Sequence, residues 1–108
     1  MGMRLLSFLK LPDINKGVEE YQTTDGAALL DVRDPEEYAS GHIPGAVNIP
    51  REEIEKAKEL IPDQDTPIFT YCYSGRRSDY AGISLRKMGY KSVKNIGGIT
   101  SYKGTLEK

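Results

Sequence analysis

Two residue types that build many functional sites are scarce in this chain, which contains one cysteine and one histidine. A single cysteine excludes a disulfide within the chain, and together with a single histidine it cannot supply the usual ligands of a zinc site. We therefore expect no metal and no cofactor. An unpaired thiol is typical of a reducing compartment, so we expect a cytoplasmic protein.

Strong net charge and long apolar runs are absent as well. The formal net charge of -1 gives no general attraction for nucleic acid or for anionic membranes, so any anion-binding site must be local. No apolar run is long enough to cross a bilayer, and the apolar stretch within Arg4–Lys10 lacks the length and the cleavage site of a signal peptide. With 108 residues, 38% hydrophobic and 29% charged, the chain is predicted to form one globular domain over 1–108, and its oligomeric state stays open.

Short apolar runs and helical patterns alternate along the chain. Apolar runs predict strands at 27–33, 46–49, 67–71 and 92–96, with a further, very short strand around 13–14. Helical periodicity predicts helices at 14–24, 34–41, 51–61 and 77–89, and a glycine turn with a short helix or coil after residue 96. This alternation predicts an α/β fold: a small, mainly parallel sheet of four to five strands with helices on both faces.

The second predicted helix has the clearest end signals. Asp34 is a candidate N-cap, Pro35 suits the first helical position, and Glu37 completes a capping-box pattern. Gly41 is the predicted C-terminal stop. We therefore expect a short helix directly after a buried strand.

The one thiol lies in the stretch "PIFTYCYSGRRSDYAG", residues 67–82. Cys72 directly follows a predicted strand, and the next helix is expected to begin near Arg77 or Ser78. Ligands of open α/β sheets bind outside the carboxyl ends of the strands, which is where Cys72 is expected. A lone cysteine in a small domain is usually a buried apolar residue. Here a glycine and two arginines follow within five residues, and this position favours a functional thiol.

Three features around Cys72 favour its ionised form. The unpaired backbone N–H groups and the dipole of the helix N-terminus attract negative charge, and Arg76 and Arg77 add two cations. Gly75 lets the loop curl tightly and point several N–H groups at one centre. We therefore expect a reactive thiolate whose pKa lies below that of a free cysteine.

The polar and aromatic neighbours of this loop have simpler expected roles. Tyr71 and Tyr73 flank the thiol, and because strand neighbours point to opposite faces, one is expected to pack inward and the other to line the site. Asp31 and Arg33, at the end of a predicted strand, are expected to form a structural ion pair, with a direct catalytic role left open. His42 is expected to hold a turn rather than to serve as the base of a cysteine hydrolase.

Three segments of the sequence resemble the rhodanese family of sulfurtransferases and together cover about residues 13–104. "LLDVRDPEEYASGHIPGAVNIP" is similar to the front half of the family, and "YCYSGRRS" is similar to its active-site loop, usually Cys-x-x-Gly-x-Arg-Ser. "VKNIGGITSYKG" resembles the closing segment, where Tyr102 stands in place of a frequent tryptophan. The resemblance implies a small parallel sheet with helices on both faces, in agreement with the alternation described above.

The resemblance also implies a reaction. Cys72 would take a sulfane sulfur from a small anionic donor such as thiosulfate, become a persulfide, and give the sulfur to cyanide or to a thiol. Glutathione and thioredoxin-like proteins are candidate acceptors, and no nucleic acid or membrane partner is expected. Arg76 and Arg77 would attract the donor, although Arg77 could instead brace the loop. The substrate would be bound by the residues that follow the thiol, namely Tyr73, Ser74, Gly75, Arg76, Arg77 and Ser78.

Two other functions are weighed against this one. Cysteine-dependent phosphatases use a Cys-x5-Arg loop and an aspartic general acid. In this chain four residues separate Cys72 from Arg77, and no such acid stands at a recognised place. A non-catalytic binding module of the same family is the second alternative. Many such modules lose the cysteine, whereas this chain keeps Cys72 and both loop arginines, which argues against that alternative.

Overall fold

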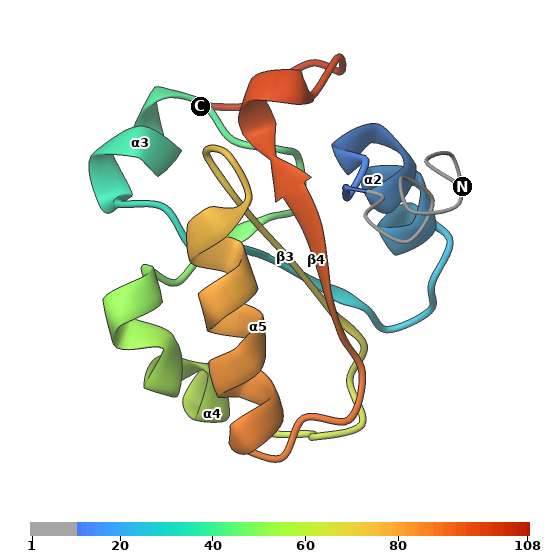
Figure 1. The fold of residues 1–108 in the computed structure, drawn as a ribbon, viewed down its shortest axis with the longest axis vertical. Helices are drawn as coiled ribbons and strands as arrows, with labels where there is room; N and C mark the ends of the chain where they lie inside the picture. Colours follow the sequence, from blue (N-terminus) through green and yellow to red (C-terminus); the bar gives the residue numbers. More distant parts are fainter. Residues whose placement is uncertain (1–10) are drawn as a thin grey trace, which may run out of the picture.

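The structure, a computed structural model, describes residues 11–108, and within them the chain forms a four-stranded sheet in which every pairing is parallel (Figure 1). The stretch Arg4–Lys10, considered above as a targeting segment, lies outside the described residues. The spatial order is β2-β1-β3-β4, with β1 (Ala28–Asp31), β2 (Val47–Asn48), β3 (Ile68–Cys72) and β4 (Val93–Gly98). The predicted α/β fold with a mainly parallel sheet is confirmed.

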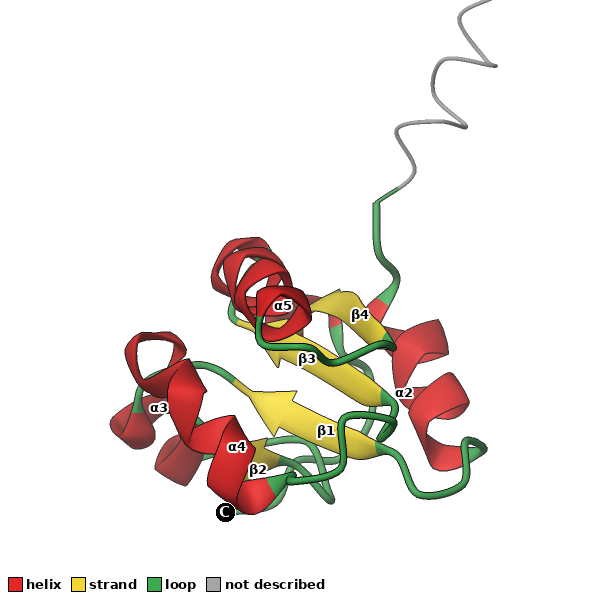
Figure 2. Ribbon diagram, turned by 90° about the horizontal axis from the view of Figure 1, so that it is seen from below, coloured by secondary structure: helices red, strands yellow, loops and turns green. Residues whose placement is uncertain are grey.

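Helices cover both faces of the sheet, as predicted (Figure 2). One face is covered by α2, and the other by α5 and α4. None of the helices in residues 11–108 combines the length and the apolar character needed to span a membrane. The helical elements are α2 (Ile14–Gln22), α3 (Pro35–Ser40), the 3-10 helix η1 (Arg51–Lys56), α4 (Ala57–Leu60), α5 (Arg76–Lys87) and the 3-10 helix η2 (Ile99–Ser101).

Two apolar cores follow from this layering. Because successive strand residues point to opposite faces, Leu29 of β1 and Phe69 of β3 pack toward α2. Leu30 and Ile68 point the other way and pack under α5. Cys72 has the same orientation as Ile68 and belongs to the α5 side of the sheet.

The end signals of α3 are confirmed. Pro35 is its first residue, and Asp34 is the N-cap. The backbone N–H of Asp34 donates to the carboxylate of Glu37 at 3.0 Å, which completes the capping box. Gly41 follows the last helical residue. Local sequence therefore determines where this short helix begins and ends.

Two predicted elements differ from the structure: the short strand at 13–14 and the helix at 51–61. No strand forms at 13–14, because Asp13 is the N-cap of α2 and its carboxylate accepts hydrogen bonds from two N–H groups of the first turn at 3.0 and 3.4 Å. The helix predicted at 51–61 is α-helical only in α4. Its first part forms 3-10 turns, and the backbone of Glu53 leaves helical geometry there.

A third difference is a β-bulge next to the thiol. The predicted glycine turn after residue 96 is instead the end of β4. Thr70 of β3 pairs with Asn95, but the next residue, Tyr71, pairs with Gly97 and skips Ile96. Gly97 supplies the left-handed backbone of the bulge, with a φ of 110°. The bulge redirects the end of β4 toward the loop that follows Cys72.

Candidate active site

Cys72 is the last residue of β3 and lies at the carboxyl edge of the sheet. Its side chain is only 1% exposed and packs in the core beneath α5. The next helix begins at Arg76, one or two residues before the predicted start. The expected setting, a thiol between a strand end and a helix N-terminus, is confirmed.

The backbone between Cys72 and α5 curls around the sulfur atom. Gly75 is the N-cap of α5 and has a left-handed φ of 102°, a conformation that other residues adopt only with strain. Its N–H donates to the sulfur of Cys72 at 3.0 Å. The hydroxyl of Ser78, in the first turn of α5, lies 3.4 Å from the same sulfur. An N–H group of the loop and a hydroxyl group of α5 therefore both lie within hydrogen-bonding distance of the sulfur.

A missing side chain on β4 allows this loop to approach closely. A Cβ atom at Gly98 would lie 2.4 Å from the carbonyl oxygen of Tyr73 and 2.6 Å from the Cα of Ser74. Both of these atoms are backbone and cannot move away without moving the loop. Gly98 therefore sets the distance between β4 and the loop around Cys72.

Burial is the largest effect on the Cys72 thiol and opposes its ionisation. Hydrogen bonds from the Ser78 hydroxyl and from the backbone N–H groups of Ser78, Gly75 and Ser74 act in the opposite direction and outweigh burial. The pKa of Cys72 is therefore lowered from its ordinary value. The expected direction is confirmed, but the main favourable cause is hydrogen bonding from the loop rather than the charge of the two arginines.

The two loop arginines have different surroundings. Arg77 makes a two-point contact with Glu37 of α3, with Nη1–Oε1 and Nη2–Oε2 distances of 2.8 and 3.1 Å. This contact raises the pKa of Arg77 and lowers the pKa of Glu37. Of the two roles left open for Arg77, its contacts favour bracing the loop.

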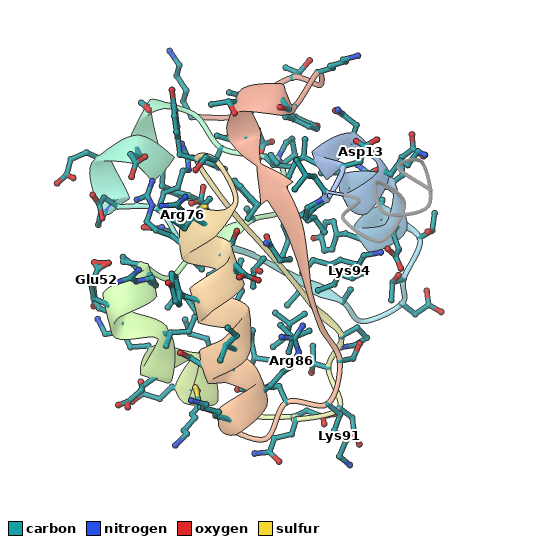
Figure 3. The ribbon with its side chains drawn as sticks, in the orientation of Figure 1. Asp13, Glu52, Arg76, Arg86, Lys91 and Lys94 are labelled. Carbon is teal, nitrogen blue, oxygen red and sulfur yellow. The ribbon has the colours of Figure 1, made fainter. Side chains whose placement is uncertain are left out.

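Arg76 is exposed at the N-terminal end of α5, beside the loop that leads from β3 (Figure 3). It lines a cleft of about 670 Å³ together with Ser74 and Gly75 of the loop. The opposite wall of the cleft is formed by the end of β4 and by residues 11–14. Among the loop residues proposed for substrate binding, Arg76 therefore presents its charge to solvent.

Of the two tyrosines beside the thiol, one packs inward and the other does not, as predicted. Tyr71 is fully buried, whereas Tyr73 is 55% exposed at the surface of the loop. The hydroxyl of Tyr71 donates to the carboxylate of Asp31 at 2.7 Å and accepts a hydrogen bond from the N–H of Ile43 at 3.1 Å. Burial, followed by the bond to Asp31, raises the pKa of Tyr71 well above its usual value, so the hydroxyl stays protonated.

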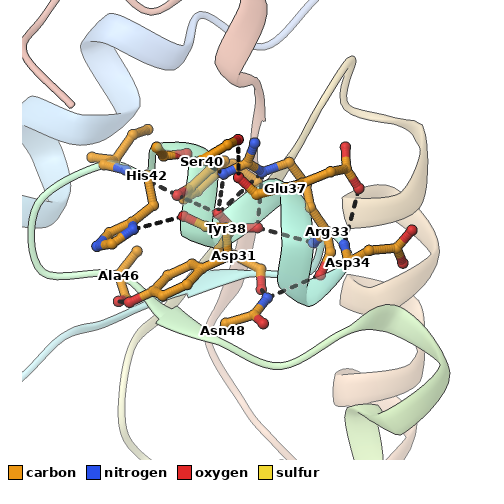
Figure 4. Close-up of polar contacts among 12 residues, drawn as sticks. Asp31, Arg33, Asp34, Glu37, Tyr38, Ser40, His42, Ala46 and Asn48 are labelled. Carbon is orange, nitrogen blue, oxygen red and sulfur yellow. Dashed lines mark hydrogen bonds and ion pairs between the residues drawn. The ribbon is translucent and has the colours of Figure 1, made fainter. Parts of the chain in front are cut away.

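Asp31 and Arg33 form a buried ion pair with a separation of 2.7 Å, and the structural role predicted for them is confirmed (Figure 4). The guanidinium of Arg33 also donates to the carbonyl of Gly41 at 2.7 Å. These contacts fasten the segment after α3 to the end of β1. None of them reaches the sulfur of Cys72.

His42 holds a turn, as predicted, rather than acting on the thiol. Its Nδ1 lies 2.9 Å from the carbonyl oxygen of Tyr38, and its ring stacks on the ring of Tyr38 at 3.8 Å (Figure 4). Its backbone pairs with Glu107. Within residues 11–108, no three side chains of His, Cys, Asp or Glu gather in a way that could hold a metal ion.

The sequence did not predict the site contacts of two residues, Glu37 and Asn95. Glu37 was assigned only to the capping box, although it also pairs with Arg77. Asn95 was not singled out at all, yet its side chain bonds to the Ser78 hydroxyl and to the carbonyl of Gly75. No sequence signal marks Asn95, because its orientation depends on the bulge in β4.

These features define a class of protein: an α/β domain that holds one thiol, its pKa lowered by hydrogen bonds, in a tight loop at the carboxyl edge of a parallel sheet. Comparison with known families agrees. Residues 14–105 match the family described as the rhodanese-like domain. The chain therefore belongs to the rhodanese-like family, and the resemblance of its three segments is confirmed.

Individual relatives give the same result. Thiosulfate sulfurtransferase PspE of Escherichia coli (strain K12) is 42% identical over 71 residues, which is 65% of this chain and 68% of that protein. The putative sulfur carrier protein YrkF of Bacillus subtilis (strain 168) is 40% identical over 78 residues, but that match is 72% of this chain and only 42% of YrkF. A solved structure of a rhodanese with anions from E. coli superposes with a TM-score of 0.71 at 37% identity, covering 76% of this chain and 98% of that one.

Proposed function

We propose that this chain is a sulfurtransferase that moves one sulfane sulfur from a donor to an acceptor through Cys72. The observation that carries the proposal is the 3.0 Å hydrogen bond from the N–H of Gly75 to the sulfur, made at the N-terminus of α5. Such a loop lowers the pKa of the thiol and offers donors to a second, charged sulfur atom. The name of PspE, a thiosulfate sulfurtransferase, supports the class of donor.

In the first half-reaction the Cys72 thiolate attacks the sulfane sulfur of a donor such as thiosulfate. A sulfur–sulfur bond forms, the bond between the sulfane sulfur and the sulfonate sulfur breaks, and its electron pair leaves with sulfite. The negative charge moves from Sγ to the outer sulfur of the persulfide. No proton is transferred, so the reaction requires no general acid or base, in keeping with the structural contacts of His42.

The loop would bind the donor and then the charged outer sulfur. Its exposed arginine, Arg76, would attract the anionic donor, and Arg77 would brace the loop through Glu37. Negative charge on the outer sulfur would be stabilised by the N–H groups and side chains of the substrate-binding segment, namely Tyr73, Ser74, Gly75, Arg76, Arg77 and Ser78.

In the second half-reaction a thiophilic acceptor removes the outer sulfur. A thiolate or cyanide attacks that sulfur, the persulfide bond breaks, and its electron pair returns to Cys72 as a thiolate. We propose glutathione or a thioredoxin-like protein as the cellular acceptor class, and a cytoplasmic location, because a reducing compartment keeps Cys72 unpaired. The chain would act as one domain over 1–108.

Thiocyanate formation from thiosulfate and cyanide tests the proposal. The native protein should turn over, and Cys72→Ser should reduce turnover to the uncatalysed rate while unfolding at the same denaturant concentration. Hydrolysis of para-nitrophenyl phosphate, run in parallel, should be negligible. Full sulfur transfer by Cys72→Ser, or phosphatase activity that this substitution abolishes, would exclude the proposed function.

A further inference from the structure

One hydroxyl group in the site is shared among several acceptors. The Oγ of Ser78 lies 2.7 Å from Oδ1 of Asn95, 3.1 Å from the carbonyl oxygen of Gly75 and 3.4 Å from the sulfur of Cys72. A hydroxyl carries a single hydrogen, so it can donate to only one of these acceptors at a time. Ser78 is fully buried, so water does not compete for this hydrogen.

The amide of Asn95 has a fixed orientation. Its Nδ2 donates to the carbonyl of Gly75 at 3.1 Å, and its Oδ1 accepts a hydrogen bond from the N–H of Gly97 at 3.0 Å. Turning the amide over would set a donor against the Gly97 N–H and an acceptor against the Gly75 carbonyl. The atom that faces Ser78 is therefore an acceptor, and the 2.7 Å contact requires Ser78 to donate.

The bulge in β4 brings this amide to the thiol. Gly97, with its left-handed backbone, directs its N–H back to the side chain of Asn95 two residues earlier. The neighbouring Lys94 lies on the α2 side of the sheet, where it pairs with Glu20 (Figure 3). Asn95 therefore lies on the α5 side, where Ser78 contacts it.

We propose that Asn95 is a positioning residue that holds the Ser78 hydroxyl while the Cys72 sulfur is uncharged and releases it to the sulfur when the thiolate forms. A thiolate accepts hydrogen bonds more strongly than a neutral amide oxygen, so ionisation turns the hydroxyl hydrogen from Asn95 to Sγ. Once a second sulfur is bonded, the charge lies on the outer atom and the hydroxyl returns to Asn95. Only this last step rests on the proposed function.

Asn95 therefore competes for the hydrogen that stabilises the thiolate. Removing its Oδ1 should take away the nearest competing acceptor, so that only the neutral carbonyl of Gly75 and the sulfur remain within reach of the Ser78 hydroxyl, and donation to the thiolate is favoured. The charged groups on the elements packed around the thiol are unchanged by such a substitution, and none of them is bonded to the Ser78 hydroxyl or the Asn95 amide within the described residues. They are Asp31 of β1, Arg33 after β1, Glu37 of α3, Arg51 of η1, Arg76, Arg77 and Asp79 of α5, and Lys94 of β4.

A double-mutant cycle on the titration of the thiol tests the proposal. The rate of alkylation of Cys72 by iodoacetamide is measured against pH in the native protein, Asn95→Ala, Ser78→Ala and the double variant. With Ser78 present, Asn95→Ala should lower the midpoint by about half a pKa unit. With Ser78→Ala, the same substitution has no hydroxyl to release, and the midpoint should stay unchanged or rise because the bond to Gly75 is lost.

Lys94→Ala, on the same strand but the opposite face, is the matched control and should leave the midpoint at its native value. The proposal is overturned if Asn95→Ala leaves the midpoint unchanged or raises it when Ser78 is present. It is also overturned if Asn95→Ala lowers the midpoint equally with and without Ser78.

Asn95→Asp provides a second test if Asn95→Ala does not fold. The charged oxygen introduced by Asn95→Asp should accept the Ser78 hydrogen bond more strongly than the amide oxygen does. The midpoint of Cys72 alkylation should therefore rise more when Ser78 is present than in Ser78→Ala, and an equal rise in both would contradict the proposal. Alkylation requires no sulfur transfer, so this result is independent of the proposed function.

Discussion

Arg77 and Glu37 lie forty positions apart in the sequence and form a two-point ion pair that ties the first turn of α5 to α3. The same carboxylate accepts the N–H of Asp34 at the start of α3. Because the loop around Cys72 leads directly into α5, this pair holds the loop from outside. Both side chains are about 30% exposed, so solvent weakens the pair without removing it.

Acid should weaken this brace once Glu37 becomes protonated. The bond to Arg77 lowers the folded-state pKa of Glu37, so its contribution to stability is complete above the unfolded-state pKa and is lost as the pH falls through the folded value. Glu37→Gln should therefore cost about 1 kcal/mol of unfolding free energy at neutral pH and less at an acidic pH where the Glu37 carboxylate is protonated in the folded state as well. Urea unfolding at both pH values measures this. Glu36→Gln, in the same turn of α3, is the control, and an equal cost of Glu37→Gln at both pH values would contradict the expectation.

Substitution of the two loop arginines should change different kinetic constants. Arg76→Ala removes an exposed cation beside the cleft and should raise the KM for thiosulfate several-fold, with kcat and stability nearly unchanged. Arg77→Ala removes the brace and should lower kcat, with a loss of about 1 kcal/mol in unfolding free energy. Added salt should raise the KM of the native protein but not that of Arg76→Ala. If Arg77→Ala changes only KM while Arg76→Ala changes only kcat, the roles are reversed.

Two glycine substitutions should have opposite effects. Gly98→Ala would set a Cβ 2.4 Å from the Tyr73 carbonyl oxygen, and it should abolish most activity and cost about 1–3 kcal/mol of unfolding free energy. Gly82→Ala, within α5, would meet no atom closer than 3.6 Å, and it should stabilise the protein by about 0.5–1 kcal/mol with activity retained. Chemical unfolding and thiocyanate formation measure both. An active, stable Gly98→Ala protein would show that the loop does not depend on this close approach.

The length of the loop should exclude phosphatase chemistry. Four residues separate Cys72 from Arg77, and the loop closes on one sulfur with a donor at 3.0 Å. A phosphoryl group needs donors around three oxygens, which takes a wider ring. Inserting one glycine after Gly75 should move the donors away and reduce sulfur transfer by roughly 100-fold. The same insertion after Asp25, in an exposed turn, is the control and should leave sulfur transfer intact. Equal losses of activity in both proteins would show that the length of the loop around Cys72 is not what matters.

Local patterns predict much of this fold. Alternating apolar runs and helices indicate the α/β class, and the capping residues of α3 place its ends correctly. The thiol at a strand end, the burial of one of the two flanking tyrosines and the structural His42 also follow from sequence. These features depend on residues that are neighbours in the chain or on rules that hold for any parallel sheet.

The remaining features arise from tertiary contacts that no local pattern contains. The partner of Arg77 is Glu37, which belongs to another helix. The sequence alone therefore could not decide whether Arg77 binds the donor or braces the loop. The two glycines after Ile96 suggest a turn, but pairing with β3 keeps them in the strand as a bulge. That bulge orients Asn95, so the contact of Asn95 with Ser78 could not be anticipated.

Intact-mass measurement after incubation with thiosulfate tests the central claim most directly. The native protein should gain the mass of one sulfur atom, located on Cys72 by peptide mapping, and should lose it when cyanide or a dithiol is added. Cys72→Ser should gain nothing under the same conditions. A native protein whose mass stays unchanged with thiosulfate and with other sulfane-sulfur donors, although Cys72 still reacts with iodoacetamide, would contradict the account.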